Sequence, residues 1–277
     1  MSPTLSPSTI ASLHTLITTS TSGATPLLPG AIVLILDSSG SPLFTHTTPN
    51  LTPQTLFPIH SCSKLIGALS FLQLLDRGLA SLDDPSLISH HLPELWGKKV
   101  LVGVKETEAG QKEYVFEDRR GDITARMLLN HTNGTGMSFF NEELRSYLGA
   151  DLASINEGTS YFENLVRSPL LWHPGTRTNY GQGLDWVSVL VERITGESME
   201  DVIRGGFFTP WVYARGDERG VGGNGVSTSD GDFWAHSLKL GDGSFMQLPG
   251  WGESRVDSAD AWPGGKPTCR AWQMDWC

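Results

Sequence analysis

The stretch FPIHSCSKLIG, residues 57–67, decides how this sequence of 277 residues is interpreted. It places Ser61 three residues before Lys64, and the apolar spacing that follows predicts a helix from Ser61 to about Arg77. On a helix, this spacing puts the hydroxyl and the ammonium on one face, one turn apart. A serine hydroxyl becomes a nucleophile when an adjacent base takes its proton, and Lys64, followed by Leu65 and a further apolar residue, is placed to be desolvated for that task. The pair predicts acyl transfer, whereas the alternative for the tetrapeptide alone is an N-capping serine followed by a solvated lysine.

The composition indicates a protein that acts on small molecules. The formal net charge is -10, from 20 Lys and Arg against 30 Asp and Glu, which opposes nucleic acid or an anionic membrane as the partner. The sequence has no apolar run near the ~20 residues of a membrane span and no signal-peptide pattern at its start, so we expect a cytoplasmic protein. Its cysteines, Cys62, Cys269 and Cys277, show neither a disulfide framework nor a zinc pattern.

Hydrophobic spacing predicts a mainly helical chain with one hairpin near its start. The expected elements are a helix over 8–19, strands over 31–36 and 42–46, the buried helix over 61–77, a helical turn over 123–132, and helices over 184–194 and 230–240. The expected organisation is one domain over 1–243 and an irregular tail over 244–277. That domain would contain an N-terminal helix and hairpin (7–48), a mainly helical catalytic region (55–200) and a glycine-rich segment (216–243).

Several stretches follow one another in a characteristic order. They are the nucleophile stretch 57–64, LQLLDRG with LDDP over 72–85, MLLNHTNG over 127–134, PGT over 174–176 before Tyr180, the segment 183–196, and GGNGVSTSDGDF over 222–233. Together they resemble the serine beta-lactamase-like superfamily, which includes class C beta-lactamases, D-alanyl-D-alanine carboxypeptidases, related esterases and fungal acyltransferases of the lovastatin type. Residues 183–196 resemble the fungal transesterase branch more than the bacterial lactamases. The resemblance implies an α+β sandwich of the beta-lactamase/transpeptidase type, with an antiparallel sheet flanked by helices and a mainly helical region.

The resemblance also implies the chemistry of the site. Ser61 would be the nucleophile that accepts the acyl group, Lys64 the proton acceptor, and Tyr180 a phenolate-capable base that carries protons to and from the leaving group. The backbone amide of Ser61 would form half of an oxyanion hole. The implied partners are a small ester or thioester as acyl donor and water or an alcohol as acceptor, with neither a metal nor a cofactor. The lactamase pattern Tyr-x-Asn is replaced here by Tyr180-Gly181-Gln182, which favours an esterase or transferase.

The C-terminal part departs from the family pattern. A strand carrying Lys-Thr-Gly or His-x-Gly is not found, and Lys266-Pro267-Thr268 is a poor substitute because proline cannot donate to a sheet ladder. We therefore expect a truncated or mis-spliced product whose C-terminal sheet strands are incomplete. Such a product would leave a hairpin edge unpaired and an apolar face of the Ser61 helix uncovered. A catalytically impaired or inactive relative, or a binding module, is the alternative to an enzyme.

Two further patterns are weak. The glycines at 220, 222 and 225 match a dinucleotide fingerprint in form, but no buried strand precedes them, so a flexible loop is expected. His90 and His91 are adjacent and do not share a face, which predicts a surface loop rather than a metal site. The sequence leaves the oligomeric state open.

Overall fold

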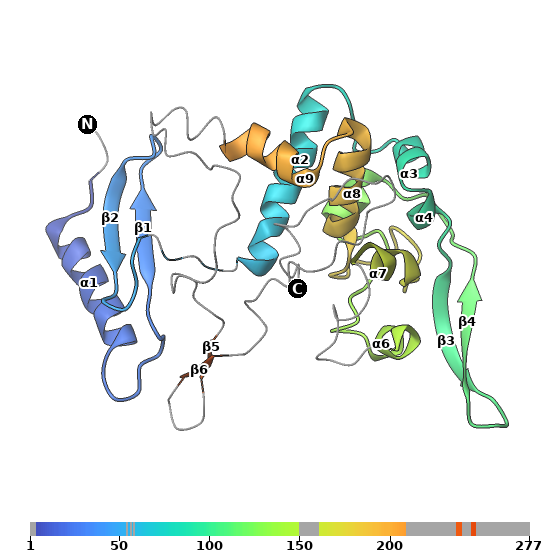
Figure 1. Ribbon diagram of the computed structural model, residues 1–277, viewed down its shortest axis with the longest axis horizontal. Helices are drawn as coiled ribbons and strands as arrows, with labels where there is room; N and C mark the ends of the chain where they lie inside the picture. Colours follow the sequence, from blue (N-terminus) through green and yellow to red (C-terminus); the bar gives the residue numbers. More distant parts are fainter. Residues whose placement is uncertain are drawn as a thin grey trace. The chain divides into compact units, whose positions relative to one another are not determined.

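The computed structural model describes residues 4–53, 55, 57, 59–149, 161–208, 237–239 and 245–247, and the chain divides into two compact units (Figure 1). The first unit comprises Met1–Pro58 and Gly223–Ser254, and the second comprises Ile59–Gly222 and Arg255–Cys277. Helices and small two-stranded antiparallel sheets occur in both, which confirms the predicted α+β class. The predicted domain over 1–243 and tail over 244–277 stay predictions.

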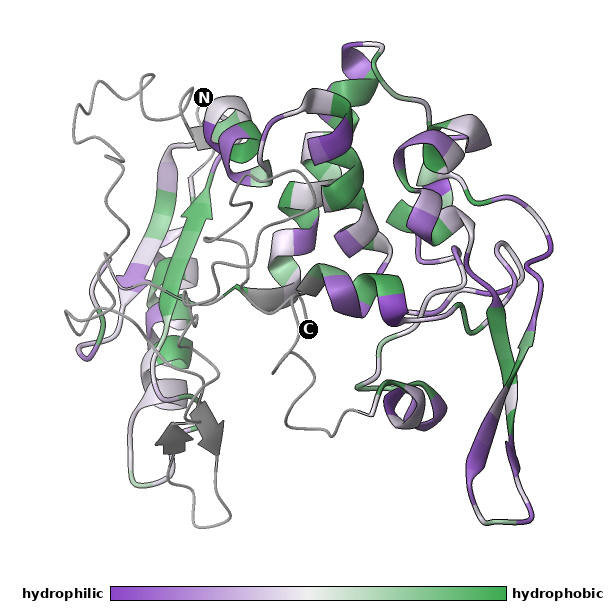
Figure 2. Ribbon diagram, turned by 45° about the vertical axis from the view of Figure 1, so that its right-hand side comes forward, coloured by the Kyte–Doolittle hydropathy of each residue, from purple (hydrophilic) through white to green (hydrophobic). Residues whose placement is uncertain are grey.

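The first unit contains a helix and a hairpin, as the hydrophobic spacing predicts. Helix α1 (Pro7–Thr21) begins at an N-cap, where the Ser6 hydroxyl accepts the Thr9 N–H at 3.1 Å and a proline occupies the first turn. Strand β1 (Ile32–Leu36) pairs antiparallel with β2 (Pro42–Thr47). Figure 2 shows that β1 is almost wholly hydrophobic.

One face of this hairpin packs with α1. Ile35 pairs with Phe44 and Val33 with His46, so these side chains share a face, and Phe44 is buried. The ring of His14, on α1, lies 4.9 Å from that of Phe44. Its Nδ1 is 2.8 Å from Nδ1 of His46, so the helix and the strand are joined by both an apolar and a polar contact.

The first unit also contains a short hairpin that the sequence reading missed. Strands β5 (Ser237–Lys239) and β6 (Phe245–Gln247) pair antiparallel. The predicted helix over 230–240 is therefore wrong for residues 237–239, and residues 245–247, within the predicted irregular tail, form a strand. Strands of three residues are too short to show a hydrophobic period, and they are stabilised by pairing with each other across the hairpin. The other residues of both predicted segments lie outside the described residues.

The second unit is mainly helical. Its helices are α2 (Ser63–Asp76), α3 (Pro85–His91), α4 (Pro93–Trp96), α5 (Ala125–Leu129), α6 (Glu142–Leu148), α7 (Tyr161–Arg167), α8 (Gly183–Thr195) and α9 (Met199–Ile203), with a π-helical turn over Arg204–Phe208. The helices predicted over 123–132 and 184–194 correspond to α5 and α8, and α8 ends where Gly196 takes the left-handed conformation. His90 and His91 form the last residues of α3, so their predicted surface loop is wrong. The cap of this helix explains the difference, because Asp84 accepts the Ser86 N–H ahead of a first-turn proline.

The core of this unit is built around α8, which packs against α2, α3 and α5. Phe71 and Leu74 of α2 meet Trp186 and Leu190 of α8 in one cluster of buried side chains. Each such side chain contributes roughly 1.5–3 kcal/mol through removal of apolar surface from water. This packing fixes α2 relative to the segment that leads into α8.

Two polar contacts secure the edges of the core. Arg193 of α8 donates to both carboxylate oxygens of Glu94 at 2.8 and 2.9 Å, and this hydrogen bonding holds the pKa of Glu94 below its usual value. The buried Lys98 donates from Nζ to the carbonyls of Leu165 and Val166 at 2.8 and 2.7 Å, and also to the Ser168 carbonyl. Burial lowers the pKa of Lys98 to about 8. The lysine thus satisfies carbonyls at the C-terminal end of α7 that the helix itself leaves unpaired.

The helix α2 buries one of its faces and exposes another. Its buried residues are Ser63, Lys64, Gly67, Ser70, Phe71 and Leu74. Leu65, Leu69 and Leu72 are instead 65%, 39% and 39% exposed. The helical period is therefore confirmed, and Phe71 and Leu74 provide the contacts with α8. Leu65, Leu69 and Leu72 form an exposed apolar face, as expected above for this helix.

A second hairpin was not expected in the middle of the chain. Strand β3 (Val100–Glu106) pairs antiparallel with β4 (Lys112–Glu117), and Gly110 in the connection has φ +73°. Val100 and Leu101 at the start of β3 are buried, but the rest of β3 and all of β4 are exposed or half-buried and include charged residues. The two strands therefore lack the apolar alternation of a half-buried strand. The region between α4 and α5 is therefore a hairpin rather than irregular chain.

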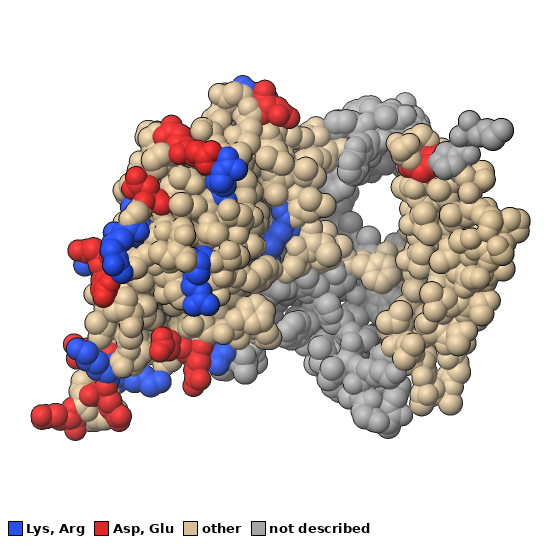
Figure 3. Space-filling view, turned by 180° about the vertical axis from the view of Figure 1, so that it is seen from behind, with Lys and Arg blue, Asp and Glu red and all other residues tan. Residues whose placement is uncertain are grey.

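Charges are unevenly distributed between the described parts of the two units. Figure 3 shows Lys and Arg interspersed with Asp and Glu over the surface of the second unit, and few charged side chains on the first. No large basic patch is seen on this face. Within the described residues, none of the helices has the length and apolar character needed to cross a membrane.

Candidate active site

Ser61 lies in a tight turn immediately before α2. Residues His60–Cys62 form a 3-10 turn, closed by the Cys62 N–H donating to the Ile59 carbonyl at 2.9 Å, and α2 begins at Ser63. The prediction that Ser61 itself opens the α-helix is therefore wrong by two residues. A 3-10 turn brings positions i and i+3 onto the same side, so the predicted relation between Ser61 and Lys64 survives.

Lys64 is buried and directed at the serine. Its Nζ donates to Ser61 Oγ at 3.4 Å, and its side chain is 9% exposed. The expected shielding by Leu65 is not found, because that side chain points into solvent. Burial of the lysine comes instead from the rest of its surroundings, including Tyr180, whose ring centre lies 5.0 Å from Nζ.

Tyr180 completes the group from a distant part of the chain. Its hydroxyl lies 2.8 Å from Ser61 Oγ, although 119 positions separate the two residues. It lies in the loop before α8, and the packing of α8 on α2 brings this loop to the start of α2. The structure thus brings together the three residues selected from the sequence.

The loop formed by residues 131–135 holds Tyr180 in place. The Asn179 N–H donates to the His131 carbonyl at 2.9 Å, and the Gly181 N–H donates to Nδ1 of the His131 ring at 3.4 Å. The Asn179 side chain donates to the Thr135 carbonyl at 3.3 Å. Gly181 packs so closely on Thr135 that an added Cβ would collide with its carbonyl group. Sequence reasoning did not select His131 or Gly181, because a backbone acceptor and a close backbone approach leave no distinctive residue pattern.

The ring of His131 also packs against the ring of Tyr180. The ring centre lies 4.8 Å from that of Tyr180, at an interplanar angle of 37°. Burial, and then the nearby charge of Lys64, hold the pKa of His131 below its usual value. The Nδ1 atom accepts the Gly181 N–H, so the neutral ring carries its proton on Nε2.

Gln182, the residue that departs from the lactamase pattern, points elsewhere. Its Nε2 donates to the hydroxyl of Ser168 at 3.3 Å, and its Oε1 is buried without a hydrogen-bond partner among the described residues. It stands at the N-cap position of α8 but makes no side-chain cap bond. This side chain therefore contacts the segment after α7.

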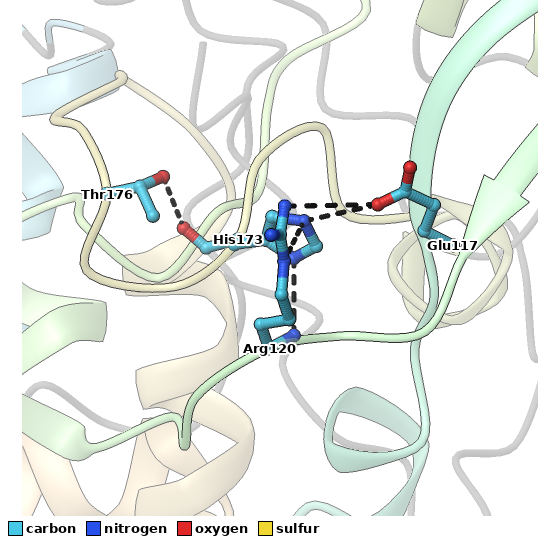
Figure 4. A network of polar contacts seen from close by, with 4 residues as sticks. All are labelled: Glu117, Arg120, His173 and Thr176. Carbon is cyan, nitrogen blue, oxygen red and sulfur yellow. Dashed lines mark hydrogen bonds and ion pairs between the residues drawn. The ribbon is translucent and has the colours of Figure 1, made fainter.

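A polar network stabilises the segment 173–176, which precedes Tyr180 (Figure 4). The Arg120 N–H donates to His173 Nδ1 at 3.2 Å, and Glu117 Oε2 lies 3.5 Å from His173 Nε2. Nε2 is also within 2.9 Å of Arg120 Nε. The Thr176 hydroxyl donates to the His173 carbonyl at 2.7 Å, which closes the turn. The hairpin strand β4 thereby anchors the loop that leads to the site.

Aromatic residues stand beside the reacting groups. Phe140 is 69% exposed, and its ring meets that of Tyr180 edge to face at a centroid distance of 6.1 Å. Phe139 is also exposed and packs edge to face on Phe140 at 4.9 Å. An exposed pair of phenylalanines at a polar reaction centre offers apolar contact to a bound molecule.

The described residues contain no group of three or more His, Cys, Asp or Glu arranged to hold a metal ion. His90 and His91 lie ring against ring at 4.7 Å at the end of α3, remote in sequence from Ser61 and Tyr180. The glycine fingerprint over 220–225, the segment 222–233 and Lys266 lie outside the described residues.

Comparison with known proteins identifies the family. Residues 26–220 match the family model described as Beta-lactamase, which is well over half of the chain. The chain belongs to the Beta-lactamase family. This confirms the resemblance predicted from the sequence and, with it, the beta-lactamase/transpeptidase-like fold.

The similar proteins include fungal esterases and acyltransferases. The chain is 31% identical over 191 residues to the lovastatin esterase of Penicillium rubens, covering 65% of this chain and 46% of the relative. It is 31% identical over 196 residues to the monacolin J acid methylbutanoyltransferase of Aspergillus terreus, covering 66% and 46%. The unliganded simvastatin synthase (LovD) from Aspergillus terreus superposes with a TM-score of 0.61 at 28% identity, covering 74% of this chain and 53% of that one. The chain spans about half the length of the relatives that it matches.

Proposed function

We propose that this chain transfers acyl groups through a serine ester: the acyl group of an ester or thioester moves to Ser61 and then to water or an alcohol. The observation that carries the proposal is the position of Ser61 Oγ, 2.8 Å from the Tyr180 hydroxyl and 3.4 Å from Lys64 Nζ. Two proton-carrying groups within reach of one hydroxyl are what general-base activation of a nucleophile requires.

In the first step, Ser61 Oγ would attack the carbonyl carbon while its proton passes to the phenolate oxygen of Tyr180. Lys64, with Nζ 3.4 Å from Ser61 Oγ and 5.0 Å from the Tyr180 ring centre, would be the second group beside the serine that can accept a proton. The electron pair of the carbonyl double bond would move onto the carbonyl oxygen. The Ser61 N–H would donate a hydrogen bond to the resulting oxyanion. Collapse of the intermediate breaks the bond to the alcohol or thiol, which leaves with the proton held by Tyr180.

In the second step, water or an alcohol would attack the acyl carbon on Ser61. Tyr180 takes the proton of the incoming hydroxyl and returns a proton to Ser61 Oγ as the ester bond to the serine breaks. The products are an acid or a new ester, and the enzyme is regenerated without a cofactor. The same group thus serves as base and then as acid in each half of the reaction.

The proposal also concerns the acyl acceptor of the second step, which is water or an alcohol. A relative named as an esterase and another named as an acyltransferase are equally similar to this chain, which supports both acceptors. The exposed Phe139 and Phe140 favour an apolar substrate. We propose a small acyl group and a bulky secondary-metabolite alcohol as the preferred pair. A cytoplasmic location stays a prediction.

The test is turnover of 4-nitrophenyl butanoate by the whole chain, with Ser61→Ala and the matched Ser63→Ala as comparisons. We expect release of 4-nitrophenol by the unchanged protein and by Ser63→Ala, and none above background by Ser61→Ala. Added apolar alcohols should divert acyl groups from butanoic acid to a butanoate ester. No turnover by a folded sample would favour the inactive alternative, and rapid opening of a penicillin or cephalosporin would favour a beta-lactamase.

A further inference from the structure

His131 has a backbone conformation that is uncommon for residues other than glycine. Its φ is +59°, and among the described residues it alone combines a Cβ with a positive φ. This left-handed conformation is unfavourable for a residue with a Cβ, and asparagine tolerates it better than most. A histidine kept in such a conformation indicates that its surroundings require this side chain in this place.

The conformation lets one residue hold three consecutive positions around Tyr180. The His131 carbonyl accepts the N–H of Asn179 at 2.9 Å, on one side of the tyrosine. Its Nδ1 accepts the N–H of Gly181 at 3.4 Å, on the other side, and its ring packs on the tyrosine ring at 4.8 Å. Backbone and side chain of His131 therefore determine where the Tyr180 hydroxyl lies.

Only the neutral ring can make all of these contacts. Acceptance of the Gly181 N–H needs a lone pair on Nδ1, which protonation removes. Among the described residues, the titratable groups that face this ring are Lys64, from α2, and Tyr180, from the loop before α8. A positive charge on the His131 ring would repel the ammonium of Lys64. It would also draw the Tyr180 oxygen away from Ser61.

We propose that neutral His131 is a positioning residue, which holds the Tyr180 hydroxyl against Ser61 and releases it when the ring becomes protonated in mild acid. The proposal deepens the proposed acyl transfer and rests on it for its effect on rate. His131 itself does not touch the reacting atoms in this account. Burial and the charge of Lys64 both keep the pKa of the ring low, so the neutral form prevails near neutral pH.

Two variants of His131 test the proposal by separating three properties of the residue: its hydrogen-bond acceptor, its titratable ring and its positive φ. His131→Asn keeps a side-chain acceptor and tolerates the positive φ, but it does not titrate. His131→Gly relieves the backbone and removes the side chain. His90→Asn is the matched control, because it makes the same substitution at an exposed histidine at the end of α3, away from Tyr180.

The first readout is the rate constant for labelling of Ser61 by a fluorophosphonate between pH 5 and 8. We expect the unchanged protein and His90→Asn to lose labelling as the pH falls below about 6.5, in addition to the loss from other groups. His131→Asn should label roughly tenfold more slowly at pH 8 and lack the histidine-dependent part of the fall. His131→Gly should label roughly 100-fold more slowly at every pH, as expected for loss of alignment. An Asn profile that matches the unchanged protein, or a Gly variant that labels at full rate, would overturn the proposal.

The second readout does not depend on catalysis. In NMR spectra, the Gly181 amide and the Tyr180 ring signals should titrate together with His131 in the unchanged protein and in His90→Asn, and should not titrate in His131→Asn. If the protein never labels while these signals still titrate together, the proposed function fails and the positioning role stands. If the protein labels but the signals do not follow His131, the positioning role fails and the proposed function stands.

Discussion

Gly181→Ala should disable the site without touching any reacting atom. An alanine Cβ at this position would lie 2.7 Å from the carbonyl carbon and 2.8 Å from Oγ1 of Thr135, and closer still to the carbonyl oxygen. Ordinary contact begins at 3.4 Å, so relief of the contact with the carbonyl oxygen, which is the closest of the three, requires the two backbones to separate by roughly 1 Å. Because Thr135 is buried and its neighbours are packed, most of that movement falls on the loop that carries Tyr180.

The size of the effect follows from the geometry of the site. The Tyr180 hydroxyl lies 2.8 Å from Ser61 Oγ, so a shift of this size moves it out of good hydrogen-bond range. A misplacement near 1 Å costs about 10²-fold in rate, so we expect labelling 10- to 100-fold slower, or about 1.4–2.7 kcal/mol of activation free energy.

The assay is the second-order rate constant for fluorophosphonate labelling, measured on Gly181→Ala and on Gly103→Ala as the matched control. Gly103 lies in β3, has no positive φ, and has no atom within 4 Å of an added Cβ. The control should label at the unchanged rate. Full-rate labelling by a folded Gly181→Ala protein would refute the claim that backbone contact with Thr135 positions Tyr180.

Three other predictions concern the surroundings of the site. Lys98→Met should lower the free energy of unfolding by about 2–4 kcal/mol in urea, because buried carbonyls after α7 lose their donor; an unchanged midpoint would contradict this. Phe140→Ala should raise KM for apolar esters several-fold with little change in kcat, and equal effects on short polar esters would argue against an apolar contact. Glu94→Gln should destabilise the protein by about 1 kcal/mol at pH 7. Because the pKa of Glu94 is lowered in the folded state, its contribution is present above the unfolded value of 4.5 and is lost as the pH falls through the folded value, so the difference between the variant and the unchanged protein should shrink as the pH is lowered below 4.5.

The elements that the sequence predicts well are those with local signals at both ends. Helix α1 has a serine cap and a first-turn proline, and α8 combines a strong helical period with a terminal glycine, so both were placed within a few residues. The charged hairpin β3–β4 and the short strands β5 and β6 were missed, because their stability depends on pairing with other segments.

The residues of the candidate site also divide into those that the sequence predicts and one that it does not. Ser61 and Lys64 are local neighbours, and Tyr180 was reached through the family resemblance, so all three could be named from the sequence. His131 could not be selected, because its role depends on a positive φ and on the N–H groups of Asn179 and Gly181, some fifty residues away. The spacing of the leucines on α2 predicts the helix but does not tell which of its faces meets α8, which is the face of Phe71 and Leu74.

The measurement that tests the central claim most directly is intact-mass spectrometry of the purified chain after exposure to a fluorophosphonate, beside Ser61→Ala. We expect one added phosphonyl group, located by peptide mapping on Ser61, and an unchanged mass for the variant. An unmodified mass on a folded sample, or an equal addition to Ser61→Ala, would contradict it.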